Sequence, residues 1–320
     1  MAERATLVIG TRGSPLALAQ AREAQARLSV AHAWPVEQLP LAVIRTTGDA
    51  IQDRPLSEAG GKGLFTRELD IALLEGTIDV AVHSAKDLPT ALPESVVIAG
   101  CLPREDVRDA FISLQAASLR DLRPGAVVGS ASLRRQAQIR RLRPDLRVTL
   151  LRGNVQTRLG KLEHGEVDAT LLAMAGLSRL GLTDHATAVL DPEDFLPAVG
   201  QGAIAIVIRA DDVRTHEAVR PILDAPTRLA LVAERAFLAV LDGSCRTPIA
   251  GWARFVGDDS ESRGQELEFL ELEFRGQVLR PDGSDSLDIV RRGPAGEAAR
   301  LGREAGQALL ARMPDGFLKA

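Results

Sequence analysis

Short apolar runs alternate with amphipathic stretches along the first two thirds of the chain. Runs of this length that are closed by Gly, Ser or Pro are typical of buried strands, and the stretches between them repeat at helical spacing. This alternation predicts an α/β fold in which parallel strands are joined by crossover helices. The strands predicted in this way are 6–10, 41–46, 78–83, 96–99, 126–129, 148–151, 169–173 and 203–208.

The first predicted helix follows from its local sequence. Ser14 is a favourable N-cap residue, and Pro15 suits the first helical position because it lacks an amide proton that would be left unpaired there. Apolar residues then recur at the spacing of one helical face. That face consists of Ala17, Ala21, Ala24 and Leu28. A second helix is predicted at 64–75, after a glycine-rich segment at 60–63 that can approach a ligand closely.

The pattern changes at Pro226, where a longer amphipathic helix with Leu229, Ala233 and Phe237 on its apolar face begins. Alternating segments follow, which predicts a small α+β domain. Its predicted strands are 249–255, 267–274 and 286–291, its last helix is 295–312, and the polar segment 257–265 predicts a mobile hairpin loop. We therefore expect three domains: 1–102 together with 203–220, then 106–197, then 225–320.

Charged and hydroxyl side chains gather where the predicted strands end. Lys86 and Asp87 follow the strand at 78–83, and arginines or serines follow the strand ends near 10, 129, 151 and 173. Ligands of open α/β sheets bind at the carboxyl ends of strands. A single Lys-Asp pair there is more often a surface ion pair, but its repetition with arginines favours a binding site. If the two groups of βαβ units face each other, these side chains converge on one cleft.

The arginines indicate an anionic ligand. From Arg104 to Arg179 there are 14 Lys and Arg residues against 8 Asp and Glu residues, so this segment carries +6 and the rest of the chain −10. Thirteen of the 14 cations are Arg, whose fork of N–H groups suits carboxylates and phosphates. A solvated basic surface is the alternative. Nucleic acid is disfavoured as a partner because aromatic residues make up only 3% of the chain and Tyr is absent.

Composition restricts the class of protein further. A chain of 320 residues with 45% hydrophobic and 26% charged residues can bury large cores in two or three domains. No apolar run suits a signal peptide or a membrane span, so we expect a cytoplasmic protein that does not bind membranes. The cysteines, Cys101 and Cys245, are far apart and lack partners for a disulfide framework or a zinc site. No metal is predicted, and a chemical role stays open for one thiol.

A series of motifs resembles those of the porphobilinogen deaminases, also called hydroxymethylbilane synthases. The motifs occur in the order typical of that family and span nearly the whole chain. They are TRGSPLAL from Thr11, GGKGLF from Gly60, HSAKDLP from His83, RED from Arg104, RDAF from Arg108, SLRR from Ser132, LRGN from Leu151 and PAVGQG from Pro197.

This resemblance implies a fold and a reaction. The fold is α/β, with two domains like those of class II periplasmic binding proteins around a cleft and a small α+β third domain. The reaction is the stepwise head-to-tail condensation of four porphobilinogen units into hydroxymethylbilane, with release of ammonia, in tetrapyrrole biosynthesis. The resemblance also implies a monomer with a dipyrromethane cofactor bound as a thioether to Cys245, which lies just past a predicted helix end.

The resemblance also assigns roles to residues. Asp87 is implied as the catalytic carboxylate, which assists the departure of ammonia and stabilises cationic pyrroles. The implied cofactor-binding residues besides Cys245 are Lys86, Asp106, Ser130, Ser132, Arg134 and Arg135. The implied substrate-binding residues are Arg12, Ser14, Arg152, Arg158 and Arg179, with Lys62 and Phe65 in a loop over the site.

Three positions depart from the family pattern, namely Glu58, Ala131 and Ser244. They leave open individual anion contacts and the behaviour of the loop, but they do not affect Asp87 or Cys245. The alternative function is a two-lobed protein that binds a small anion without catalysis. Such a protein would share the arginine-rich strand ends but would have no use for Asp87 or Cys245.

Overall fold

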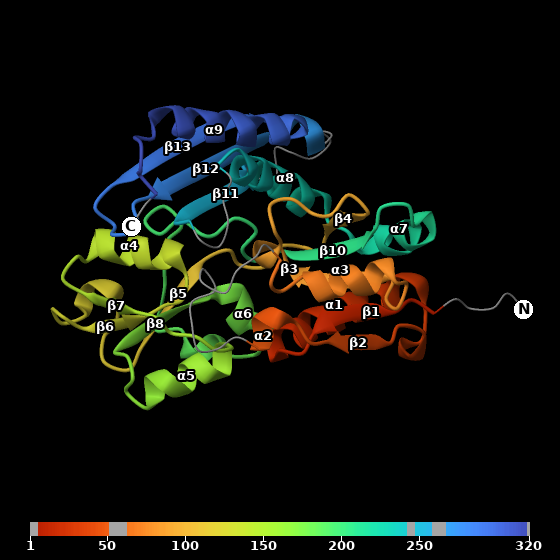
Figure 1. Cartoon of the computed structure of the whole chain (residues 1–320), viewed down its shortest axis with the longest axis horizontal. Coiled ribbons are helices and arrows are strands. Elements are labelled where there is room, and N and C mark those ends of the chain that lie inside the picture. The colour runs from red at the N-terminus through yellow and green to blue at the C-terminus, as the bar shows by residue number, and fades with distance from the viewer. Residues whose placement is uncertain (1–5, 51–62, 242–246, 258–266, 319–320) are drawn as a thin grey trace, which may run out of the picture. The chain divides into compact units, whose positions relative to one another are not determined.

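The computed structural model describes residues 6–50, 63–241, 247–257 and 267–318. These residues contain two five-stranded mixed sheets and one three-stranded antiparallel sheet, with helices packed on them (Figure 1). The predicted α/β fold class with a small α+β third part is confirmed. The described residues divide into two compact units: one runs to Glu105 and includes 203–228, and the other comprises 106–202 and the described residues from Leu229 onward. The boundaries predicted for three domains stay a prediction.

The first sheet has the strand order β2-β1-β3-β10-β4. β1 is parallel to β2 and β3, whereas β10 is antiparallel to β3 and β4. Its strands are β1 (Ile9–Arg12), β2 (Leu41–Ile44), β3 (Val80–Ser84), β4 (Val96–Cys101) and β10 (Ile204–Arg209). Helix α1 (Pro15–His32) buries the predicted face of Ala17, Ala21, Ala24 and Leu28, and Ser14 caps it as predicted. The strand predicted at 6–10 is observed as Ile9–Arg12, so it extends beyond its predicted end. Arg12 therefore ends the strand and does not lie in the turn that follows it.

The second sheet repeats this topology in the order β7-β6-β8-β5-β9. Its strands are β5 (Asp109–Ser113), β6 (Val127–Gly129), β7 (Arg147–Thr149), β8 (Ala169–Ala173) and β9 (Ala188–Val189). Phe111 and Leu171 pack with Ile139 of α4 (Leu133–Leu142), while Ala110 and Leu172 pack with Leu159 of α5 (Val155–Glu163). Alternate residues of one strand therefore face opposite helices, and Figure 1 shows α4 and α5 on opposite sides of this sheet.

One strand in each mixed sheet runs against the others, and this decides which residues share an edge. Ile204 at the start of β10 pairs with Ser84 at the end of β3. Asp109 at the start of β5 likewise pairs with Ala173 at the end of β8. An antiparallel strand thus brings its amino end to the edge where the parallel strands have their carboxyl ends. β5 and β9 were not predicted from the sequence, and Asp109 was therefore not expected at this edge.

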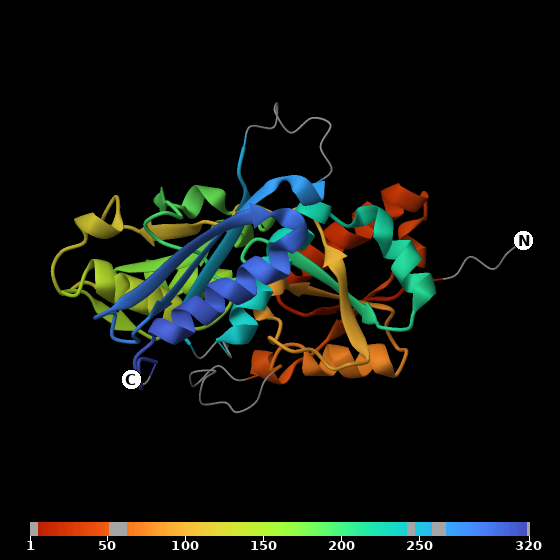
Figure 2. The same ribbon diagram turned by 90° about the horizontal axis from the view of Figure 1, so that it is seen from above.

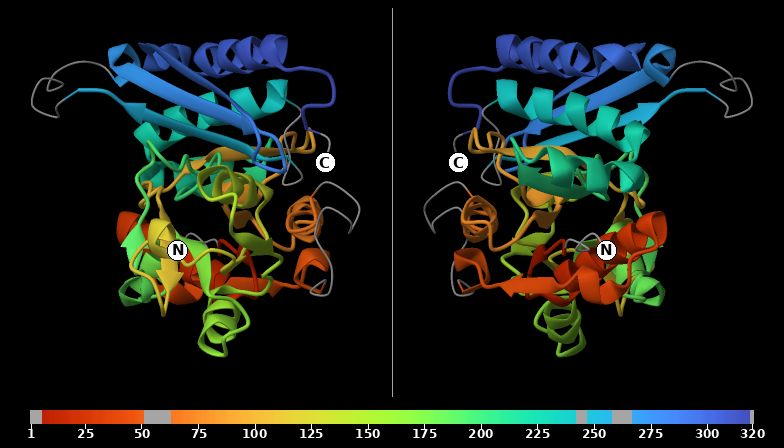
Figure 3. Two further views of the ribbon diagram at one scale, coloured as in Figure 1. Left: turned by 90° about the vertical axis from the view of Figure 1, so that its left-hand side faces the viewer. Right: turned by 90° about the vertical axis from the view of Figure 1, so that its right-hand side faces the viewer.

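The third sheet is the antiparallel meander of β11 (Ile249–Phe255), β12 (Glu271–Leu279) and β13 (Ser286–Pro294). Helices α8 (Ala225–Val240) and α9 (Ala298–Arg312) pack on it through a shared apolar core, and Figures 2 and 3 show these elements from further directions. The predicted strand 267–274 was placed too early. Phe255, where β11 ends, pairs with Leu272, so residues 267–269 have no strand partner and form a 3₁₀ turn.

The remaining helices are short. They are α2 (Thr47–Ala50), α3 (Arg67–Leu74), α6 (Met174–Arg179) and α7 (Val213–Val219). The helix predicted at 64–75 is therefore confirmed as the shorter α3. The final helix predicted at 295–312 is confirmed as α9, preceded by a single 3₁₀ turn at Ala295–Glu297. The hairpin loop predicted at 257–265 lies almost entirely outside the described residues.

Two glycines of α9 allow α8 and α9 to touch. A Cβ atom on Gly302 would lie 2.0 Å from the backbone oxygen of Ala233, and one on Gly306 would lie 2.7 Å from Cβ of Val240. Both distances are shorter than the closest approach of atoms that are not bonded to each other, so the helices would have to move apart. Glycine is therefore required at these positions by the contact between helices.

Gly302→Ala should reduce the stability of the third sheet and its two helices by about 1–3 kcal/mol, because the added methyl group must push α9 away from α8. The matched control is Gly160→Ala on α5, where a Cβ would meet nothing within 4 Å. That control should stabilise the protein by up to about 1 kcal/mol, since alanine favours the helix. Differential scanning calorimetry of both variants measures the two effects. Equal midpoints in both variants would contradict the close approach of α8 and α9.

Candidate active site

The predicted residues of the first sheet meet at one edge. Arg12 ends β1, and Lys86 and Asp87 lie in the 3₁₀ turn Ala85–Asp87 that follows β3. Nη1 of Arg12 lies 3.9 Å from Oδ2 of Asp87, and the Asp87 side chain is 34% exposed. The Arg12 guanidinium also lies 4.0 Å from the ring centroid of Phe65. Arg12 is therefore held between an aromatic ring and a carboxylate that remains accessible to a ligand.

Ser14 has a structural role at the same edge. Its Oγ accepts a hydrogen bond of 3.3 Å from the backbone N–H of Ala17, which caps α1. The hydroxyl can still donate a proton to an acceptor elsewhere. Lys86 is half-buried beside Ala85.

A buried histidine lies two residues before the 3₁₀ turn. His83 is 4% exposed, and its Nε2 has no hydrogen-bond partner among the residues that the structure describes. Burial, with a smaller contribution from the Arg12 charge, lowers the pKa of His83 to about 4. The imidazole is therefore neutral at physiological pH and adds no positive charge beside Arg12.

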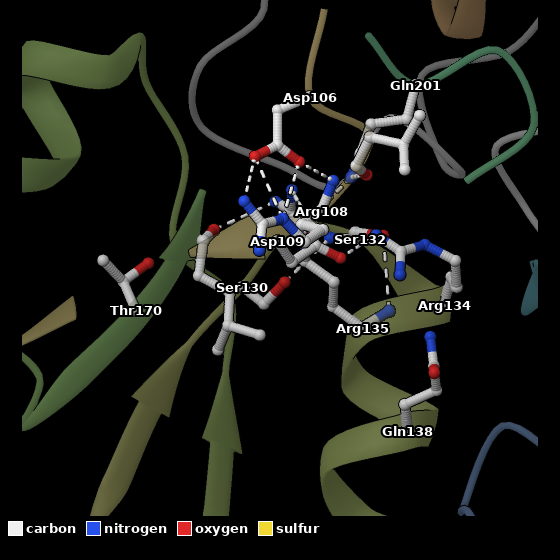
Figure 4. Close-up of polar contacts among 12 residues, drawn as sticks. Asp106, Arg108, Asp109, Ser130, Ser132, Arg134, Arg135, Gln138, Thr170 and Gln201 are labelled. Carbon is white, nitrogen blue, oxygen red and sulfur yellow. Dashed lines mark hydrogen bonds and ion pairs between the residues drawn. The ribbon is translucent and has the colours of Figure 1, made fainter. Parts of the chain in front are cut away.

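Three buried charges form the centre of the second sheet's edge (Figure 4). Nη2 of Arg134 donates to Oδ2 of Asp109 at 2.7 Å, while Nη2 and Nε of Arg135 donate to Oδ1 at 2.6 and 3.1 Å. Both arginines come from the first turn of α4, whose N-cap is Ser132. The side chain of Gln201 donates to Oδ1 of the same aspartate at 3.0 Å. The predicted arginine pair therefore already has a carboxylate partner within the chain.

The electrostatics of this group follow from burial and pairing. Burial alone would raise the pKa of Asp109, but the charges and hydrogen bonds of Arg134 and Arg135 outweigh it and hold that pKa well below its usual range. Burial lowers the pKa of Arg134, with the Arg135 charge acting in the same direction and Asp109 opposing both. Two guanidinium groups thus share one carboxylate. Nε of Arg134 is buried without a hydrogen-bond partner in the described part of the chain.

Ser130 and Ser132 precede these arginines in the chain, and Asp106 precedes Asp109. Oγ of Ser130 accepts from the backbone N–H of Ser132 at 3.2 Å, and Oγ of Ser132 accepts from that of Arg135 at 3.4 Å. Asp106 binds Arg108 through both carboxylate oxygens, at 2.6–3.0 Å. Burial raises the pKa of Asp106, but the hydrogen bonds from Arg108 outweigh it and leave the pKa below its usual value. Asp106 is therefore an anion that orients Arg108.

The other predicted arginines belong to the same unit. Arg152 follows β7, and Arg158 lies in the first turn of α5, where its Nε donates to the Gly153 carbonyl at 2.9 Å. Arg179 ends α6, and its Nη2 donates to the Gly202 carbonyl at 3.0 Å. These bonds to the Gly153 and Gly202 carbonyls orient the guanidinium groups of Arg158 and Arg179.

Two predicted site residues, Cys245 and Lys62, lie outside the described residues, as do the departures Glu58 and Ser244. Cys101 is buried at the end of β4. Asp109 was missed by the sequence analysis. The available signal was the motif RDAF, in which an aspartate directly precedes an apolar run. Its significance depends on β5 running antiparallel, because only then does the aspartate reach the arginine edge.

Comparison with known proteins agrees with the order and extent of these motifs. Residues 7–217 match the family model "Porphobilinogen deaminase, dipyromethane cofactor binding domain", and residues 228–311 match "Porphobilinogen deaminase, C-terminal domain". The chain belongs to the porphobilinogen deaminase family. The family, the transferase class and the dipyrromethane cofactor predicted from the sequence are confirmed by this membership.

Porphobilinogen deaminases of two bacteria illustrate the similarity. Those of Nitrobacter hamburgensis and Paracoccus denitrificans are 57% and 53% identical to this chain over 309 residues. These alignments cover 97% of this chain and 94% and 95% of the relatives. The methionine binding protein MetQ is a more distant structural neighbour, with a TM-score of 0.44 and 15% identity over 74% of this chain and 94% of its own. Within the described residues, no helix is long and apolar enough to cross a membrane.

The buried His83 predicts a pH dependence of stability in this porphobilinogen deaminase family member. Between about pH 6.5 and pH 4 the unfolded chain binds a proton at this imidazole and the folded chain does not. The free energy of unfolding should therefore fall as the pH is lowered through this window, by up to about 3 kcal/mol. Urea denaturation at several pH values measures the slope. His83→Gln should have a shallower slope in the same window, and an unchanged slope would contradict this assignment.

Proposed function

We propose that this chain is a hydroxymethylbilane synthase that condenses four porphobilinogen units head to tail and releases ammonia at each step. The observation that carries the proposal is the match of the two family models to residues 7–217 and 228–311, together with 57% identity to a porphobilinogen deaminase. The arginine-rich strand ends support it, because every porphobilinogen unit adds carboxylates that cations must neutralise.

The residues of the second unit suit a cofactor that carries carboxylates. Arg134 and Arg135 keep one net positive charge after pairing with Asp109, and Nε of Arg134 has no acceptor within the described residues. An uncompensated buried cation is costly, so an anionic group placed here would be bound favourably. We assign the acetate and propionate groups of a dipyrromethane to Lys86, Ser130, Ser132, Arg134 and Arg135, with Asp106 nearby and Cys245 as the covalent attachment. When bound, the dipyrromethane supplies the free pyrrole carbon to which the first substrate is joined.

The substrate carboxylates are assigned to a second set of residues. Arg12 is already oriented by the ring of Phe65 and by Asp87, so little side-chain entropy is lost when it binds a carboxylate. The other residues assigned to substrate are Ser14, Lys62, Arg152, Arg158 and Arg179. Each arginine contact to a carboxylate is charge-assisted and can be bidentate.

Asp87 is assigned the catalytic role. Its carboxylate lies 3.9 Å from Arg12 and is partly exposed, so it can reach a bound pyrrole. An ionised carboxylate accepts hydrogen bonds from pyrrole N–H groups and stabilises the positive charge that develops as ammonia leaves. It can also take up the proton that is released when two pyrroles have been joined.

The proposal also covers the location, oligomeric state, partners and domain limits of the protein. We assign the protein to the cytoplasm and regard it as a monomer that binds neither nucleic acid nor membranes, with domain limits at 1–102 plus 203–220, 106–197 and 225–320. The second candidate, an anion-binding protein without catalysis, is favoured only by the arginine-rich strand ends. The transferase family membership argues against it.

The covalent cofactor predicts a mass difference. Purified protein should exceed its sequence mass by one dipyrromethane, measured by intact-mass spectrometry. Cys245→Ser should lose the excess because it lacks the thiolate that forms the thioether. Cys101→Ser is the matched control and should keep the excess, since this thiol is buried at the end of β4. An active wild-type protein with unmodified mass would disprove the attachment.

Substitution of Asp87 distinguishes the proposed catalytic function from anion binding without catalysis. Asp87→Asn keeps the shape and removes the charge, so the variant should fold while turnover falls by roughly 10²–10⁴. Asp87→Glu keeps the charge on a longer arm and should retain more activity than Asn. Single-turnover release of ammonia from porphobilinogen measures the effect in variants whose cofactor content has been checked by mass. A near wild-type rate in a fully loaded Asn variant would exclude Asp87 from the mechanism.

A further inference from the structure

Asp109 has no role in the function assigned above, although it contacts both arginines of the proposed cofactor site. It is fully buried, and each of its carboxylate oxygens accepts from one of the two guanidinium groups. Ionised side chains are rarely buried so completely unless they are paired. The aspartate therefore makes it possible for Arg134 and Arg135 to be buried at the sheet edge when no ligand is bound.

The backbone around the group shows that the two arginines have fixed positions. Nη1 of Arg134 donates to the Leu196 carbonyl at 2.7 Å, and Nη1 of Arg135 donates to the Leu171 carbonyl at 2.9 Å. Gln201 donates to the Val107 carbonyl at 2.8 Å as well as to Asp109. Figure 4 shows the arginines and Gln201 converging on Asp109. The carboxylate is thus held by three side chains, and it determines where both guanidinium groups lie.

Asp109 neutralises only one of the two positive charges of Arg134 and Arg135. Two guanidinium groups and one carboxylate leave one net positive charge among side chains that are nearly inaccessible to water. The Nε–H group of Arg134 also points to an anionic ligand, because it is buried without an acceptor in the described part of the chain. The group is therefore preorganised to receive a further carboxylate.

We infer that Asp109 is a positioning residue for cofactor loading. It is the counter-ion already present in the chain that holds Arg134 and Arg135 in place and leaves the pair with charge for one carboxylate of the dipyrromethane. This inference rests on the proposed function, in which the arginine pair binds that cofactor. Asp109 acts through the arginines and does not itself contact the ligand.

The test follows loading of the apoprotein with porphobilinogen as the probe, by intact mass against time. Asp109→Asn keeps the shape of the side chain but leaves both guanidinium groups without a counter-ion, so its loading rate should fall by about 10- to 100-fold. The rate is measured under conditions in which circular dichroism shows the variant to be folded. A change in stability alone then leaves the rate unaffected.

Asp168→Asn is the matched control. Asp168 also pairs with an arginine and a backbone amide, Arg123 and Val127, but at the amino ends of β6 and β8, the opposite edge of the same sheet. Its replacement should lower stability and leave the loading rate unchanged. A folded Asp109→Asn variant that loads at the wild-type rate would overturn the inference and make Asp109 a purely structural partner.

Two further measurements distinguish a failure of this inference from a failure of the proposed function. If Asp109→Asn does not fold, Asp109→Glu retains the charge and shifts the carboxylate by one methylene group. That variant should load more slowly than wild type, and an unchanged rate would overturn the inference. If the wild-type apoprotein itself gains no mass from porphobilinogen, the proposed function fails before Asp109 is tested.

Discussion

The burial of Asp109 with Arg134 and Arg135 is the interaction on which the second unit's edge depends. Charged groups can be removed from water only when other charges and hydrogen bonds replace their hydration. Here the carboxylate binds both guanidinium groups, and the carbonyls of Leu171 and Leu196 accept from them as well. The positions of α4, β5 and the segment before β10 are therefore linked through one group of polar contacts, which also provides the positive charge of the proposed site.

The antiparallel strand in each mixed sheet is what makes this group possible. A wholly parallel sheet would present only carboxyl ends at the ligand edge. In this chain β5 and β10 run in the opposite direction, and both adjoin the segments where the chain passes from one unit to the other. The residues beside these passages, including Asp106 and Gln201, thereby lie near the start of β5, where Gln201 donates to Asp109.

Glu234 is a second buried carboxylate whose lost hydration is replaced by hydrogen bonds, and it lies on a helix that packs on the third sheet. Glu234 lies on α8 and is fully buried, where it accepts from the backbone N–H of Gly200 at 2.6 Å and of Ala253 at 2.9 Å. The predicted apolar face of this helix, with Leu229, Ala233 and Phe237, is buried as expected. Hydrophobic periodicity gave no indication that a glutamate beside that face would also be buried. Its burial depends on two amide groups from distant segments of the chain.

Local sequence determined most of the helices and strands, though not β5 and β9, and it identified the arginine-rich strand ends. Ser14, Pro15 and the apolar face of α1 are read from neighbouring residues, and the same holds for Ser132 at the start of α4, because caps and periodicity are short-range effects. The motifs that contain Asp87, Arg134 and Arg135 were among those that indicated the family. The direction of β5, the position of β12 in the chain, and the burial of Asp109 and Glu234 were decided by tertiary structure. Strand direction and charge burial depend on partners far away in sequence, so no local pattern encodes them.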